Sequence, residues 1–123
     1  MRVILADPHL HAREALRAFL EDEPDFELVG DAVDVQGLLQ LAEKQPADMI
    51  LLDEQLPGEA IEALIDHLHR YDPKPIVIVM SSDFTCRTRI LQAGADSFVS
   101  KVDQPDWLIH SLHQYLLRYD DQG

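Results

Sequence analysis

Four side chains of this sequence combine the residue types of an ion-binding or group-transfer site, and each stands at the end of a short predicted strand. A pair of carboxylates provides the oxygen ligands that a hard cation prefers, and a lysine and a hydroxyl provide a positive charge and a hydrogen-bond donor. One polar residue after an apolar stretch has a simple explanation, because a strand that leaves the core becomes polar. Four in this order favour a functional site; they are Asp7, Asp53, Ser81 and Lys101.

Apolar stretches alternate with amphipathic segments along the chain, which predicts the elements that position these side chains. We expect helices over about 10–20, 34–45, 59–70 and 84–93, and a last helix from Pro105. Alternating strands and helices predict a doubly wound parallel sheet with helices on both faces. Ligands of such folds bind at the carboxyl ends of the strands. The expected strands are 2–6, 26–33, 49–53, 76–81 and 97–100.

Length and composition indicate one domain over residues 1–123, with the residues after about 119 either a natural end or the start of a linker. Hydrophobic residues make up 46% of the chain, enough to fill a core. No apolar run is long enough to cross a bilayer, and no secretion signal is visible. With Cys86 as the single cysteine, an internal disulfide is excluded, and a cytoplasmic location fits best.

The formal net charge of −13 argues against direct binding of nucleic acid by this domain, because phosphate backbones require clustered lysine and arginine. Several enzyme classes lack their motifs as well. We find neither the glycine-rich turn of a dinucleotide site nor a phosphate-binding loop ending in Gly-Lys-Ser/Thr. The nucleophile elbow of a serine hydrolase is also missing. We therefore expect a domain that is not an enzyme.

The strand-end motifs, taken in order, resemble the receiver domains of two-component response regulators, and the resemblance extends from residue 1 to about 119. It implies a flavodoxin-like fold, a five-stranded parallel sheet with strand order 2-1-3-4-5. The motifs are Ile-Leu-Ala-Asp at 4–7, Ile-Leu-Leu-Asp at 50–53 with Leu-Pro-Gly at 56–58, Val-Ile-Val-Met-Ser-Ser at 77–82, and Ala-Gly-Ala-Asp-Ser-Phe-Val-Ser-Lys at 93–101.

The resemblance implies a role for each matching residue. Asp53 would accept a phosphoryl group from a histidine kinase, a phosphotransfer protein or a small phosphodonor, as carboxylates do in acyl-phosphate intermediates. Lys101 would neutralise the phosphoryl oxygens, and Ser81 would bind them and pull its loop inward. Phe98 stands at the place of the family's aromatic switch residue, and an ordinary core aromatic is an equally good interpretation of it. The sequence leaves open the output domain or partner protein, and whether the chain forms a homodimer.

The resemblance also implies a Mg²⁺ site formed by Asp7, Asp53 and the main-chain carbonyl of Gln55. Receivers usually carry a second acid after the first strand, and here that residue is Pro8, which offers no side-chain ligand. We therefore expect weak Mg²⁺ binding. Pro8 also keeps open an alternative function, a pseudo-receiver that binds proteins without being phosphorylated.

Three neighbours of the site complete the expectations. We interpret His9 as a solvated loop residue rather than a metal ligand, and we expect Glu54 to point away from Asp53 because successive strand residues alternate. Val102 replaces the proline that often follows the lysine, which favours a trans bond there. The stretch between Ser81 and Lys101 is short, so its helix or the preceding loop should be short.

Overall fold

The computed structural model describes residues 1–101, 110 and 112–115. Val102, Pro105, most of the last predicted helix and the tail after residue 119 lie outside the described residues. The elements are β1 (Arg2–Ala6), α1 (Leu10–Glu21), β2 (Glu27–Ala32), α2 (Val35–Lys44), β3 (Met49–Asp53), α3 (Ile61–His69), β4 (Ile76–Ser81), the 3-10 turn η1 (Phe84–Cys86), α4 (Arg87–Gln92) and β5 (Ser97–Ser100).

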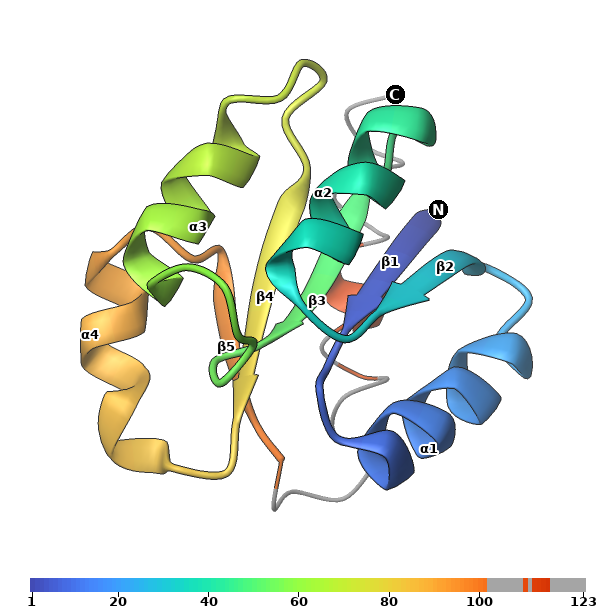
Figure 1. Ribbon diagram of the computed structural model, residues 1–123. Helices are drawn as coiled ribbons and strands as arrows, with labels where there is room; N and C mark the ends of the chain where they lie inside the picture. The colour runs from blue at the N-terminus through green and yellow to red at the C-terminus, as the bar shows by residue number, and fades with distance from the viewer. Residues whose placement is uncertain (102–109, 111, 116–123) are drawn as a thin grey trace.

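The strands form one five-stranded sheet in the order β2-β1-β3-β4-β5 (Figure 1). Every pairing is parallel, so the predicted doubly wound fold and its strand order are confirmed. In Figure 1 the arrowheads of β1, β3 and β4 point to the lower edge of the sheet. The register pairs Asp53 with Met80 and Ser81 with Ser100, which sets the ends of three neighbouring strands side by side.

Two apolar layers enclose the sheet because its central strands are apolar on both faces, as buried parallel strands are. Successive residues of each strand join opposite layers. One layer packs against α2, α3 and α4, and its strand residues include Ile4, Ile50, Leu52, Val77 and Val79. The other packs against α1 and Leu112, and its strand residues include Val3, Leu5, Met49, Leu51 and Ile78.

Helix boundaries follow the local sequence in most places. Asp34 caps α2 as predicted, because its carboxylate accepts a hydrogen bond of 2.8 Å from the N–H of Gly37. The predicted helix over 84–93 is too long: a 3-10 turn occupies Phe84–Cys86, and only Arg87–Gln92 is α-helical. The expected shortening after β4 is therefore seen in α4. In the described part of the chain, no helix has the length and apolarity to span a membrane.

Gly58 follows β3 in a conformation that strongly favours glycine, with a φ of 126°. A Cβ added there would lie 2.9 Å from the Cβ of Val35, the first residue of α2. The main-chain carbonyl of the preceding residue, Pro57, also accepts a hydrogen bond of 2.9 Å from the N–H of Val35. The loop after β3 is thus held closely against α2.

Gly58→Ala should destabilise the domain by roughly 1–3 kcal/mol, because alanine tolerates neither this φ nor the contact with Val35. Gly94→Ala is the matched control: its φ of 110° imposes the same kind of strain, but the nearest atom to an added Cβ lies 3.8 Å away. Urea unfolding of both variants measures the difference. A smaller loss for Gly58→Ala than for Gly94→Ala would contradict the described packing of the loop on α2.

Candidate functional site

Two aspartates meet at the carboxyl ends of neighbouring strands and are almost completely buried. Asp7 follows β1 and is 0% exposed, and Asp53 ends β3 and is 2% exposed. Main-chain N–H groups orient one oxygen of each: His9 donates to Asp7 Oδ1 at 2.9 Å, and Gln55 donates to Asp53 Oδ1 at 2.8 Å. Two buried carboxylates repel each other and lose hydration, so this pair requires a positive charge.

Lys101 supplies that charge. Its Nζ lies 2.7 Å from Asp7 Oδ2 and 2.5 Å from Asp53 Oδ2. The main-chain N–H of Lys101 donates to the carbonyl of Ser81 at 2.8 Å. This bond extends the pairing of β4 and β5 by one residue and positions the lysine side chain at the edge of the sheet. Burial alone would lower the pKa of Lys101, but hydrogen bonds and attraction from Asp53 and Asp7 outweigh burial and raise this pKa.

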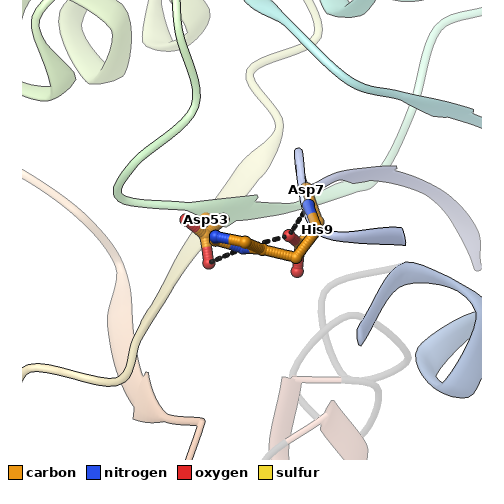
Figure 2. Close-up of side chains that lie close together, drawn as sticks. All are labelled: Asp7, His9 and Asp53. Carbon is orange, nitrogen blue, oxygen red and sulfur yellow. Dashed lines mark hydrogen bonds and ion pairs between the residues drawn. The ribbon is translucent and has the colours of Figure 1, made fainter. Parts of the chain in front are cut away.

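His9 is a half-exposed loop residue, as predicted, but its ring also lies against the carboxylates, which the sequence did not predict. Its Nδ1 lies 3.0 Å from Asp7 Oδ1, 3.9 Å from Asp53 Oδ2 and 3.4 Å from Lys101 Nζ. Figure 2 shows the imidazole between the two aspartates. The side chain is 51% exposed, so the ring contacts the buried carboxylates while about half of its surface faces solvent.

Asp7, Asp53 and Lys101 thus form a buried ion cluster. The hydroxyl of Ser81, at the end of β4, is also buried and forms hydrogen bonds with two neighbours. Its Oγ accepts from the N–H of Asp83 at 2.9 Å, and it lies at donor distance from the Asp83 carbonyl and from Glu54 Oε1, at 3.2 and 3.3 Å. The expectation that Glu54 points away from the site was therefore wrong. Alternation fails because β3 ends at Asp53 and the chain turns at Glu54.

Phe98, the candidate aromatic switch residue, is half-buried on β5 and packs against the α2–α3–α4 layer. Its ring meets Phe84 edge to face, with ring centroids 6.2 Å apart. Phe84 itself is 65% exposed and belongs to η1, directly after the short loop of Ser82 and Asp83 that follows Ser81 at the end of β4. The Phe98–Phe84 pair thus connects β5 with the segment that follows the buried hydroxyl.

The donor set fits a divalent cation. One ligand atom from each of Asp7, His9 and Asp53 lies within 4.8 Å of the other two. Bonds of about 2.1 Å place the ligand atoms of one octahedral ion roughly 3 to 4 Å apart. Gln55 lies beside this group and contacts Asp53 through its main-chain N–H; its carbonyl, the predicted ligand, makes no contact with Asp53 in that hydrogen bond.

Curated relatives with similar sequences are bacterial transcriptional regulators. The transcriptional regulatory protein DegU of Brevibacillus brevis is 32% identical over 91% of this chain and 48% of its own length. LiaR of Bacillus subtilis (strain 168) is 35% identical over 85% of this chain and 50% of its own. The chain thus spans about half the length of these relatives.

Solved structures of receivers share the fold. The isolated receiver domain of RcsB from Salmonella enterica serovar Typhimurium, determined with the phosphomimetic BeF3−, has a TM-score of 0.83 at 26% identity, over 92% of this chain and 86% of its own. A LuxR-family response regulator from Aurantimonas sp. SI85-9A1 has a TM-score of 0.84 at 24% identity, over 94% and 84%.

The family model of the response regulator receiver domain matches residues 3–113 of this chain. The matched region includes all of the sheet except Arg2, the first residue of β1, and it includes Asp7, His9, Asp53 and Lys101. The chain therefore belongs to the response regulator receiver family.

Proposed function

We propose that this domain is a signalling switch that accepts a phosphoryl group on Asp53. The contact of Lys101 Nζ with Asp53 Oδ2 and Asp7 Oδ2, at 2.5 and 2.7 Å, carries the proposal. It joins a nucleophile to the charge that its reaction needs, at the strand-end edge where ligands of such sheets bind. The membership of the family and the similarity to DegU and LiaR support the same function.

The reaction moves one phosphoryl group between two carriers. A carboxylate oxygen of Asp53 forms a bond to phosphorus, while the bond from phosphorus to the donor's nitrogen or oxygen breaks and the donor keeps that electron pair. Lys101 offsets negative charge on the transferring oxygens. Asp7 accepts a hydrogen bond from the ammonium of Lys101 and so keeps it beside Asp53. A Mg²⁺ ion bound by Asp7 and Asp53 would add further positive charge at the same oxygens.

The switch would operate through the buried hydroxyl of Ser81. To bind a phosphoryl group on Asp53, this hydroxyl has to give up donation to Glu54 or to the carbonyl of Asp83. The loop that follows Ser81 would then move, together with Phe84 and its partner Phe98. The face formed by α4 and β5 would change shape and present a different surface to partners.

A cytoplasmic histidine kinase or phosphotransfer protein is the proposed donor. A structural relative supports this partner class: CheY6 of R. sphaeroides, with a TM-score of 0.82, was solved in complex with the P1 domain of CheA3. RcsB, which shares the fold, was solved on promoter DNA, and this chain covers 59% of that protein. Given the net charge of −13, we propose that DNA contacts belong to a separate output domain or partner.

Incubation with acetyl phosphate and Mg²⁺ should add one phosphoryl group to the protein, because Asp53 is the nucleophile beside Lys101. Intact-mass measurement detects the adduct, and Asp53→Asn should abolish it. Asp96→Asn is the control, since Asp96 lies away from the site and bonds to His69. An unmodified wild-type protein at all donor and Mg²⁺ concentrations would favour the pseudo-receiver alternative that Pro8 suggests.

Pro8→Asp should tighten Mg²⁺ binding on the order of tenfold, because it restores a charged oxygen ligand, worth about 1–3 kcal/mol. Isothermal titration calorimetry measures the two affinities. Pro46→Asp is the control: it adds the same charge after α2, in an exposed position at the opposite end of the sheet. Equal or tighter binding by the natural protein would mean that another group already replaces the missing acid for Mg²⁺.

Lys101→Met should destabilise the domain near neutral pH, because it leaves two buried carboxylates without a cation. The pKa of Lys101 is raised by folding, so its stabilising effect is complete below the pKa of an unfolded lysine, about 10.4, and is lost as pH rises through the higher folded value. Urea unfolding should therefore show a difference between wild type and variant that is constant from about pH 7 to 9.

Between the unfolded pKa and the higher folded pKa of Lys101, that difference should shrink. Lys74→Met controls for general alkaline effects, since Lys74 is exposed. A wild-type advantage over Lys101→Met that grows with pH would contradict a raised pKa and the ion cluster that causes it.

A further inference from the structure

We propose that His9 Nδ1 is the third protein ligand of the cation site and that it shifts the site's preference from Mg²⁺ towards metals that accept imidazole, such as Mn²⁺, Co²⁺ and Zn²⁺. The inference rests on the phosphoacceptor pocket of the proposed function, and it assigns to that pocket a ligand and a metal class. The structural basis is that the side chain of Pro8 has no ligand atom, whereas the ring of His9 contacts the carboxylate of Asp7.

The distances allow one ion to contact all three residues. His9 Nδ1 is 3.0 Å from Asp7 Oδ1 and 3.9 Å from Asp53 Oδ2. Both lie in the range of roughly 3 to 4 Å expected between ligand atoms that share one ion at about 2.1 Å. The two oxygens of Asp7 are divided: Oδ2 contacts Lys101, and Oδ1 faces His9. An ion at Oδ1 therefore leaves the contact between Asp7 and the ammonium in place, and at Asp53 it would share Oδ2 with Lys101 Nζ.

The backbone holds the ring in this position. His9 is the N-cap residue of α1, yet its side chain makes no capping hydrogen bond, so the imidazole is not committed to the helix. Its N–H donates to Asp7 Oδ1 at 2.9 Å, which closes a tight turn over Pro8. Arg13, one turn into the helix, donates to the main-chain carbonyl of Asp7 at 2.9 Å and fixes the other side of the turn.

The chemistry of the donor set determines the preferred ion. Mg²⁺ demands oxygen ligands and gives up water reluctantly, so a neutral imidazole contributes little to its binding. Transition-metal ions and Zn²⁺ bind imidazole well, with affinities that increase from Mn²⁺ through Co²⁺. Exchange of a carboxylate for an imidazole also removes one negative charge from the site, and this loss weakens the binding of a hard cation most. The pocket should therefore bind Mn²⁺ and Co²⁺ much more tightly than Mg²⁺.

The test is electron paramagnetic resonance of Mn²⁺ bound to the full chain, at one fixed pH. Spin-echo modulation should reveal a coordinated ¹⁴N nucleus in the wild-type protein, absent in His9→Gln. His11→Gln is the matched control: His11 lies two residues further on, is exposed on α1, and should leave the nitrogen signal intact. Titration should show Mn²⁺ affinity falling roughly tenfold or more in His9→Gln, with Mg²⁺ affinity changed by less than about twofold.

No nitrogen modulation in the wild-type protein, its persistence in His9→Gln, or equal losses for Mn²⁺ and Mg²⁺ would each overturn the proposal. Acetyl phosphate treatment with Mg²⁺ separates this failure from that of the proposed function. Phosphorylation of Asp53 without a nitrogen signal would refute only the role of His9. A wild-type protein that binds neither ion and stays unmodified would refute both.

Discussion

The ammonium of Lys101, held between two buried carboxylates, is the interaction on which the site depends. Asp7 and Asp53 come from β1 and β3, and burying both charges without a cation would cost several kcal/mol for each. Lys101 arrives from the end of β5, held in place by the carbonyl of Ser81 on β4. The strand order brings the three side chains together, because β1, β3, β4 and β5 are consecutive in the sheet.

One lysine against two aspartates leaves a net negative charge in a buried place, and a bound cation would offset this charge. Pro8 and His9 distinguish this site from a typical receiver site. Pro8 has no carboxylate, and the imidazole of the next residue, His9, contacts Asp7. Glu54 adds a further carboxylate next to the hydroxyl of Ser81. In the described conformation that hydroxyl interacts with Glu54 and Asp83, so a phosphoryl group on Asp53 would have to compete for it.

The sequence predicted the parts of this arrangement that regular structure determines. Asp7, Asp53 and Lys101 stand at the ends of predicted strands, and parallel strands place their carboxyl ends at one edge, so their meeting followed from the pattern. The contacts that His9 and Glu54 make at the site were not predicted, because both residues stand where regular structure stops. The alternation rule was applied to Glu54 although β3 ends one residue earlier. The direction of the His9 ring depends on a turn over Pro8, and a signal was present: an N-cap histidine beside a carboxylate that lacks its usual acidic neighbour.

The central claim is that Asp53 and Lys101 form one phosphoryl-binding site. Fluorine nuclear magnetic resonance with beryllofluoride, the phosphomimetic used with RcsB, measures this directly. The wild-type protein with Mg²⁺ or Mn²⁺ should show bound fluorine resonances distinct from free beryllofluoride, and these should vanish in Asp53→Asn and weaken in Lys101→Met. Bound resonances that survive Asp53→Asn, or a wild-type spectrum with only the free species at saturating beryllofluoride and metal, would contradict it.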